Sequence, residues 1–317
     1  MSVAEGRLPS AATTGLIFAT SPGEANRPGP GGVQEGVTPN PDGVFSRDDL
    51  RRRHGVDDNE LRRMLRSGDL QRLRSGWFAT SDADPVVGEA VRRGGALSCV
   101  SALRHHGLWT PPGYSDDELH IRGSRHATTV ARGHRTQWCQ APGRVGSVQA
   151  AVDSVPVALA CAVRCLPAEY WVAACDSAMN RLGWTIPDLQ EGMGTVTAGM
   201  RALMARCDGR SESGTESVAR YRLTSDGYDV VVQPYIEGVG RVDLRIGRLL
   251  IECDSKAHHT SRENYRNDRR RDRQSLIDGW LYMRLIYEDV MYRWESVVSD
   301  IAAVTRADRH RMRRRQA

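Results

Sequence analysis

Residues 251–259, IECDSKAHH, place two acids, a lysine and two histidines directly after an apolar run. The run is typical of a buried strand, and successive side chains of a strand point to opposite faces. Glu252 and Asp254 are therefore predicted to share one face of a sheet, while Ile251 and Cys253 share the other. Lys256, the only lysine in the chain, follows immediately.

Asp243 lies nine residues before Glu252, and a hairpin between them would bring the two acids side by side. Carboxylates on one patch of a sheet repel one another, and acids are disfavoured in strand interiors. A divalent cation would remove the repulsion, and Mg²⁺ or Mn²⁺ suits carboxylate ligands. We predict a metal site at Asp243, Glu252 and Asp254 that could activate a water against a phosphodiester. The alternative for Asp243 is an ion pair with Arg241 or Arg245.

Lys256 would supply a compact positive charge to this site. Lysine can lose its proton when its pKa is shifted, whereas arginine effectively cannot. We expect Lys256 to stabilise charge on a phosphate or to position the nucleophile; the alternative is an accidental position. His258 and His259 would contact phosphate, assist a proton transfer or simply begin a loop.

Two predicted helices add further acids. Ser213-x-x-Glu216 is a capping-box pattern, so Glu216 either caps its own helix or contributes a carboxylate to the site. In a helix over residues 261–279, Asp268 and Asp272 fall on one face and are assigned a secondary role. The alternative is a solvated acid–arginine ladder, worth about 0.3–0.5 kcal/mol per pair. The arginines of this helix would turn outward to DNA: Arg269, Arg270 and Arg273.

Residues 44–82 have the element order of a winged helix-turn-helix. A short helix after Ser46 is followed by a tight turn at Gly55, a second helix, and a strand pair that turns at Ser75-Gly76. The second helix would enter the major groove, with the wing beside it. The alternative is an arginine-studded surface helix in a protein-contact domain. The predicted DNA-binding residues are Asn59, Arg62, Arg63, Arg66, Arg72 and Arg74.

Composition limits the function classes. The apolar fraction of 40% and charged fraction of 26% suit a globular protein, and no apolar run approaches the ~20 residues of a membrane span. The net charge of +5 is clustered in arginine-rich stretches, which indicates a polyanionic partner such as DNA. The seven cysteines include no C-x-x-C pair, so we expect buried thiols in a reduced cytoplasmic protein and no cysteine-built zinc site.

The remaining segments frame these two regions. Residues 1–43 hold six of the 14 prolines and are predicted to be disordered. Residues 83–210 form a mixed region, β-rich up to about residue 142 and helical afterwards, with residues 95–107 predicted as a helix. Residues 211–304 are predicted as a domain of order αβββαβ followed by a final helix. Residues 305–317 form an arginine-rich tail.

Residues 44–140 resemble the N-terminal region of the type IV abortive-infection antitoxins. The similarity rests on VFSRDDLRRRHGVDDNELRRMLRSGDLQRLRSGWFAT and on the later Ser101-Ala102 and Gly107-Leu108. The resemblance implies a winged helix that binds DNA and represses its own operon. It also implies a toxin or defence-module protein as a partner.

Residues 211–300 resemble the small endonuclease-like family related to the very-short-patch repair nucleases, within the PD-(D/E)XK superfamily. The similarity rests on SGTES, VD, IECDSKAHH, DRRRD and WLYMRLIY. It implies a metal-dependent nuclease with its acids at Glu216, Asp243 and Glu252. The chain departs from the superfamily at Asp254, where a lysine is usual, so either Lys256 substitutes for it or Asp254 is itself a metal ligand.

The sequence therefore predicts an α+β or α/β protein with an N-terminal winged helix, a helical middle region and a C-terminal restriction-endonuclease-like fold. The main functional prediction is a metal-dependent DNA endonuclease in repair or defence. The alternative is an antitoxin-type transcriptional regulator whose nuclease fold is catalytically silent.

Overall fold

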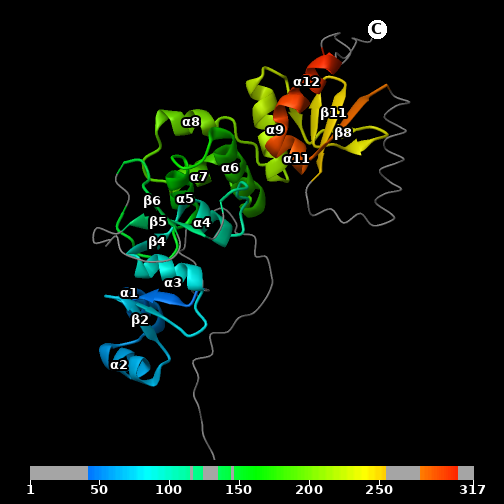
Figure 1. Cartoon of the computed structure of the whole chain (residues 1–317). Helices are drawn as coiled ribbons and strands as arrows, with labels where there is room; N and C mark the ends of the chain where they lie inside the picture. The colour runs from blue at the N-terminus through cyan, green and yellow to red at the C-terminus, as the bar shows by residue number, and fades with distance from the viewer. Residues whose placement is uncertain (1–41, 115–116, 124–134, 144–145, 255–278, 306–317) are drawn as a thin grey trace, which may run out of the picture.

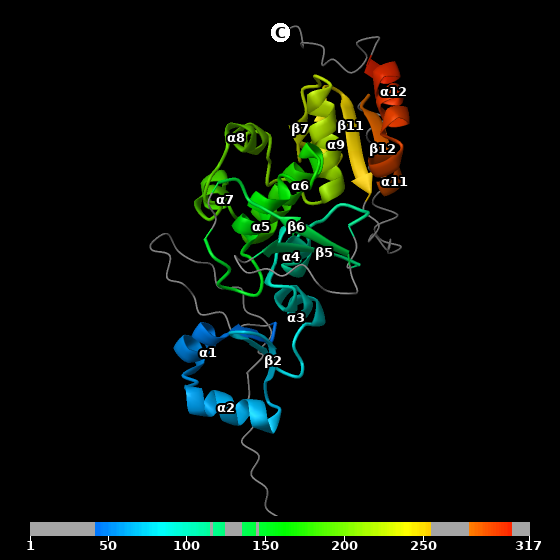
Figure 2. The same cartoon turned by 60° about the vertical axis from the view of Figure 1, so that its left-hand side comes forward.

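The chain folds into three lobes arranged in sequence order (Figures 1 and 2). The structure is a computed structural model that describes residues 42–114, 117–123, 135–143, 146–254 and 279–305. The predicted disorder of residues 1–43 and the arginine tail therefore fall almost wholly outside the described residues. No described helix is both long and apolar enough to cross a membrane.

The N-terminal lobe has two helices on a small antiparallel sheet. Its elements are β1 (Val44–Ser46), α1 (Arg47–His54), α2 (Asp58–Ser67), β2 (Gln71–Arg74) and β3 (Trp77–Ala79). The strand order is β1-β3-β2, and the β2–β3 turn falls at the predicted Ser75-Gly76. This arrangement fits the predicted winged helix-turn-helix, with β1 as a strand that the sequence did not reveal.

Local signals explain why these helices begin and end where they do. The Ser46 hydroxyl accepts the Asp49 N–H at 3.1 Å, as an N-cap does. Gly55 ends α1 at a φ of 66°, a left-handed conformation that favours glycine. The inward faces of α1 and α2 bury Leu50, Leu61 and Met64 against Phe78.

The middle lobe begins with a second small sheet. Its elements are α3 (Pro85–Arg92), β4 (Gly95–Leu97), α4 (Cys99–His105), β5 (Glu118–Gly123) and β6 (Arg135–Cys139). The strand order is β4-β5-β6, with β4 antiparallel and β6 parallel to β5. The prediction of one helix over residues 95–107 was wrong in its first part. Residues 95–97 instead pair with β5, and Gly95 lies so close to that strand that a side chain there would overlap Ile121.

Four helices complete this lobe: α5 (Val155–Ala162), α6 (Ala168–Leu182), α7 (Ile186–Glu191) and α8 (Ala198–Met204). Helix α5 is apolar on nearly every side and is buried along most of its length. A helix without a polar face must lie inside a core. The core around α5 includes Leu103, Leu159 and Trp171, with α4, α6, α7 and α8 packed around them.

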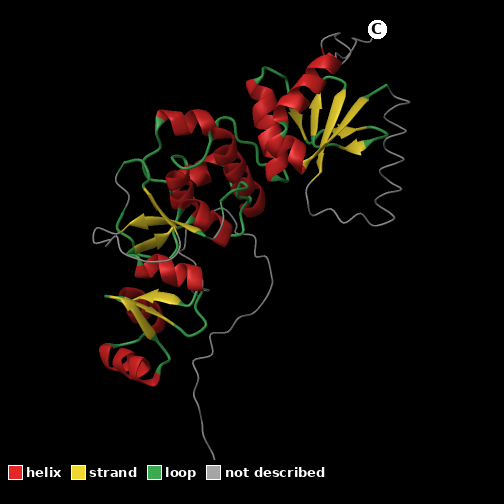
Figure 3. Ribbon diagram, in the orientation of Figure 1, coloured by secondary structure: helices red, strands yellow, loops and turns green. Residues whose placement is uncertain are grey.

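The C-terminal lobe is a sheet covered by helices on one face (Figure 3). Its elements are α9 (Gly214–Ser225), β7 (Val231–Val232), β8 (Tyr235–Ile236), β9 (Gly240–Arg241), β10 (Leu244–Ile246), β11 (Leu249–Asp254), β12 (Leu281–Ile286), α11 (Tyr287–Tyr292) and α12 (Trp294–Thr305). The strand order is β12-β11-β10-β7, with β12 parallel to β11 and the other pairs antiparallel.

The order of these elements agrees with the predicted succession of a helix, strands and a final helical segment, with two differences. A hairpin, β8–β9, is inserted before β10, and the final helix is interrupted at Arg293. The helix predicted over residues 261–279 lies outside the described residues, apart from Gly279. The assignment to the nuclease fold stays a prediction.

The middle and C-terminal lobes are joined through α6 and α9. Arg220 of α9 donates to the buried Asp176 of α6 at 2.7 Å, and Arg222 forms a second ion pair with Glu169. Gly214, the first residue of α9, lies against Trp109, whose ring would overlap any side chain at that position. The two lobes therefore share a tightly packed contact.

Candidate functional site

Glu216 belongs to a buried carboxylate pair in the C-terminal lobe. Ser213 caps α9 by accepting the Glu216 N–H at 3.1 Å, which confirms half of the predicted capping pattern. The Glu216 carboxylate accepts the Glu212 N–H at 3.0 Å and also the Gln233 side-chain amide at 2.8 Å. Glu216 therefore lies in the first turn of α9 and also contacts Gln233, which follows strand β7.

Asp243 is the second acid of the pair. The β10 register Leu244↔Ile251 places Asp243 opposite Glu252 when extended by one residue. The Cys253 N–H donates to one Asp243 carboxylate oxygen at 2.8 Å, and Gln233 donates to the other at 3.3 Å. Gln233 thus links Glu216 and Asp243 through one amide nitrogen, and we call these three residues the carboxylate group.

Burial and mutual repulsion act on both acids of the carboxylate group. Burial raises the pKa of Glu216 above its ordinary value. Burial and the charge of Glu216 together raise the pKa of Asp243 to about 6. Asp243 forms no ion pair within the described part of the chain, and Arg241 instead pairs with Glu212 at 2.6 Å. Among the described residues neither Glu216 nor Asp243 has a cationic partner, so a cation bound here would meet two unpaired carboxylates.

Glu252 and Asp254 follow the predicted alternation. Ile251 and Cys253 are buried, while Glu252 and Asp254 are half-buried on the opposite face of β11. Glu252 lies across from Arg284 of β12 and close to Tyr282, whose pKa is raised by burial and by the Glu252 charge. The extended β10 register places Glu252 beside Asp243 of the carboxylate group, and Asp254 ends the same strand.

Many of the predicted site residues lie outside the described residues, and their roles stay predictions. They are Lys256, His258, His259, Asp268, Arg269, Arg270, Asp272 and Arg273.

A second group of metal-ligating side chains was not expected from the sequence. Cys99, His120, Cys139 and Cys165 bring their ligand atoms within 4.8 Å of one another in the middle lobe. Within the described ranges, the acids of the C-terminal lobe do not form an equally compact set. The four residues are spread over 67 positions and show no paired spacing, so the sequence carried no signal for their convergence.

The exposed face of α2 carries the predicted basic residues of the N-terminal lobe. Asn59, Arg62, Arg63 and Arg66 are all exposed, opposite the buried Leu61 and Met64. Arg62 donates to the Asn59 side chain at 2.9 Å, and Arg63 pairs with Glu60.

The predicted wing residues differ from one another. Arg72 of β2 is exposed. Arg74 is half-buried and lies 5.3 Å from the centre of the Trp77 ring. Arg72 is therefore the better placed of the two to reach a partner.

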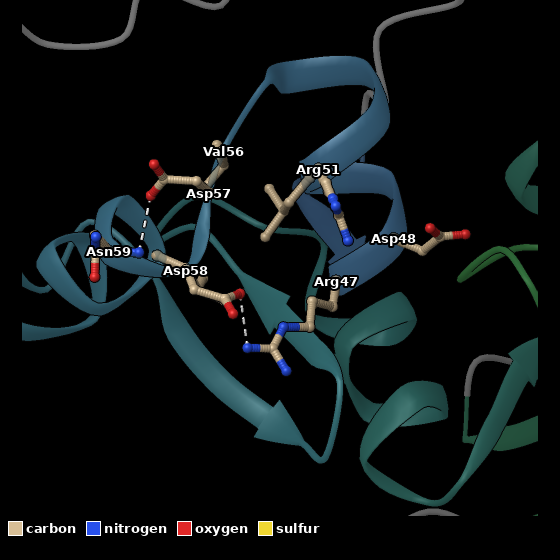
Figure 4. A pocket seen from close by; sticks show the side chains of 9 residues that line it. Arg47, Asp48, Arg51, Val56, Asp57, Asp58 and Asn59 are labelled. Carbon is tan, nitrogen blue, oxygen red and sulfur yellow. Dashed lines mark hydrogen bonds and ion pairs between the residues drawn. The ribbon is translucent and has the colours of Figure 1, made fainter.

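A groove of about 590 Å³ separates α1 from the start of α2 (Figure 4). Asp57 caps α2 by accepting the N–H groups of Asn59 and Glu60, each at 2.8 Å. Asp58 pairs with Arg47 across the groove at 2.9 Å. The beginning of α2 is thus acidic, and the positive charge lies along its exposed face and towards its end.

The comparison with protein families identifies part of the N-terminal region. Residues 41–80 match the family described as the transcriptional regulator AbiEi antitoxin. No curated protein matches the chain. The matched range covers the whole helix pair and the β2–β3 ribbon, in agreement with the first part of the predicted antitoxin-like resemblance. Its extension to residue 140 stays a prediction.

Proposed function

We propose that this protein binds DNA through its N-terminal lobe and acts as a transcriptional regulator of antitoxin type. The family match over residues 41–80 carries the proposal. The element order of the lobe and the exposed basic face of α2 support it. In this arrangement Arg62 and Arg66 contact phosphates or base edges of the DNA. Arg72, on the β2–β3 ribbon, contacts the DNA backbone.

The acidic start of α2 refines the docking. Helix N-termini often approach phosphates, but Asp57 and Asp58 would repel them here. We therefore expect α2 to meet DNA with its exposed side and its final turn. A toxin or defence-module protein is the proposed protein partner, and its stoichiometric co-purification would support this context.

A mobility-shift assay on the DNA upstream of its own gene, in EDTA, tests the regulator proposal. The double variant Arg62→Ala/Arg66→Ala should weaken binding and lower the slope of log K against log salt by about 2, since each phosphate contact contributes about one unit. The control is Arg201→Ala, an exposed arginine of α8. Unchanged binding by the double variant would refute the docking.

The second candidate is a metal-dependent DNA endonuclease acting through the C-terminal lobe. Its specific observation is the carboxylate group, where Glu216 and Asp243 share Gln233 and lie next to Glu252. Two carboxylates with raised pKa values, and with no cationic partner among the described residues, fit Mg²⁺ or Mn²⁺ as ligands. Such an ion would polarise a phosphodiester and acidify a bound water.

The protein's own residues would fix the geometry of that site. The Cys253 N–H and the Gln233 amide hold the Asp243 carboxylate, and the Glu212 N–H holds that of Glu216. Glu252 and Asp254 would approach from the neighbouring strand, with Lys256 following them in the chain.

Supercoiled plasmid incubated with Mg²⁺ or Mn²⁺, beside an EDTA control, tests the nuclease candidate. Nicking should require metal, disappear in Asp243→Ala and persist in Asp229→Ala, which removes an exposed acid of the same lobe. DNA binding in the mobility-shift assay should survive Asp243→Ala. If the wild-type protein neither nicks DNA nor binds metal in calorimetry, the C-terminal lobe is silent and the regulator proposal stands alone.

A further inference from the structure

Four metal-ligating side chains converge in the middle lobe from four separate elements. Cys99 is the first residue of α4, His120 lies in β5, Cys139 ends β6, and Cys165 follows α5. Their ligand atoms all lie within 4.8 Å of one another. Cys99, His120 and Cys139 are at most 4% exposed, and Cys165 is half-buried. We call these residues the thiol–imidazole group.

The distances within the thiol–imidazole group match a tetrahedral ion better than a disulfide. The Cys139 Sγ atom lies 3.7 Å from Cys165 Sγ and 3.4 Å from His120 Nδ1. Zinc bonds sulfur at about 2.3 Å and nitrogen at about 2.0–2.1 Å. At tetrahedral angles, two sulfur ligands are then about 3.7 Å apart, and a sulfur and a nitrogen ligand are about 3.5 Å apart. A disulfide requires about 2.05 Å between its sulfur atoms.

The backbone around these ligands is held by hydrogen bonds. The His120 N–H donates to the Ser101 hydroxyl at 3.1 Å, and the His120 carbonyl accepts the Ser98 N–H at 2.9 Å. The Tyr114 hydroxyl donates to the Cys165 carbonyl at 2.9 Å. These contacts place the ligands before any ion binds, as second-layer contacts do in metal sites.

Cys99 adds a conformational observation. Its φ of 51° lies in the left-handed region, which non-glycine residues rarely adopt. Such strain persists where surrounding contacts enforce it, and it gathers at sites with a function. Here the left-handed residue begins α4 and carries its thiol among the other three ligands.

We propose that Cys99, His120, Cys139 and Cys165 bind one structural zinc ion. Thiolate and imidazole are the ligands that zinc takes in closed, four-coordinate sites, and a full set of protein ligands leaves no position for a substrate. The ion would cross-link α4, β5, β6 and the chain between α5 and α6.

The first experiment is metal analysis of the full-length protein, purified without a histidine tag in the presence of a reductant. We expect about one zinc ion per chain in the wild type and in Cys175→Ser, which changes a buried cysteine of α6 outside the group. Cys139→Ser should lose the zinc. Equal zinc in Cys139→Ser and the wild type would overturn the assignment.

The second experiment does not depend on a variant that folds. Wild-type protein unfolded with chelator and refolded with Co²⁺ should show the intense visible bands of a tetrahedral ion and a thiolate charge-transfer band. His120→Cys should keep the metal and strengthen the charge-transfer band, since a fourth thiolate joins. Zinc-free wild-type protein that gives no such spectrum refutes the site, and a Cys139–Cys165 disulfide found by mass spectrometry would assign the pair to redox chemistry instead.

Discussion

The thiol–imidazole group of the middle lobe and the carboxylate group of the C-terminal lobe differ in how completely the fold assembles them. The former joins four soft ligands from four elements within 4.8 Å, in a buried core. The latter holds Glu216 and Asp243 on either side of Gln233, with Glu252 on the adjoining strand. A closed soft set suits a permanent structural ion, whereas separated carboxylates leave room for water and substrate.

The two proposals assign stability to the thiol–imidazole group and chemistry to the carboxylate group. A closed site contributes its binding energy to folding, because the unfolded chain has no such site. A group of acids without cations works against folding, because burial and repulsion raise the free energy of the charged carboxylates. The following predictions test this contrast in order of decreasing effect.

The largest effect should follow metal removal from the thiol–imidazole group. A strong chelator combined with a thiol reagent should lower the free energy of unfolding by more than about 4 kcal/mol, as loss of a structural metal does. Thermal unfolding, followed by circular dichroism, measures the change. Added zinc should restore the transition once the reagent is reversed, and added Mg²⁺ should not. An unchanged unfolding transition would mean that the thiol–imidazole group, like the carboxylate group, holds no structural metal.

Arg220→Ala should be next in size, with a loss of about 3–5 kcal/mol, because it leaves Asp176 buried and unpaired. Chemical denaturation would measure the loss. Since Asp176 belongs to α6 and Arg220 to α9, hydrogen exchange should increase in both lobes. The double variant Asp176→Leu/Arg220→Met should recover most of the stability. Increased exchange confined to the C-terminal lobe would mean that the middle and C-terminal lobes unfold independently.

Asp243→Asn should stabilise the metal-free protein by about 1–2 kcal/mol at pH 8, after allowance for partial exposure. The pKa of Asp243, about 6 in the folded chain, lies above its ordinary value of 3.8. The folded state therefore binds more protons between these values, and stability falls as pH rises through this window. Denaturant titrations at pH 4 and pH 8 measure the change in the free energy of unfolding, with Asp229→Asn as the control. A gain at pH 4 as large as that at pH 8 would contradict the assignment.

The smallest effect, below about 1 kcal/mol, is expected for His105→Gln. His105 of α4 contacts Asp42 at 2.7 Å and Asp84 at 3.6 Å, and the hydrogen bond to Asp42 raises its pKa above 6.5. Its contribution is complete below pH 6.5 and is lost as pH rises through the higher folded value. The free energy of unfolding, measured from pH 6 to pH 9 in the Asp243→Asn background, isolates the contribution of His105 from that of Asp243. A pH slope that persists there in His105→Gln would contradict it.

Local patterns predicted the parts of the fold that local interactions determine. The Ser46 cap, the turn at Gly55 and the amphipathic α2 were all readable, because each depends on residues within a few positions. The alternation of Ile251 and Cys253 with Glu252 and Asp254 was readable for the same reason. Gly95 was misassigned to a helix because its strand depends on contact with Ile121, which is distant in sequence.

The candidate sites show the same division. Asp243 and Glu252 could be paired from the sequence because a short hairpin joins them. Gln233 was missed, since an amide in the bend after the short strand β7 has no distinctive spacing, and its left-handed φ of 49° appears only in the structure. The thiol–imidazole group was not anticipated at all, because a parallel β5–β6 pair and the packing of α4 and α5 create it.

The contact between α6 and α9 also has a consequence for synthesis. Asp176 leaves the ribosome 44 residues before Arg220, so the nascent middle lobe carries this acid without its cation until α9 emerges. Gly214, the first residue of α9, must also pack against Trp109 before α9 covers the surface of α6. A truncated chain ending before α9 would expose this surface to aggregation and to chaperones. Expression fragments of this protein should therefore keep residues 83–305 together on one continuous chain.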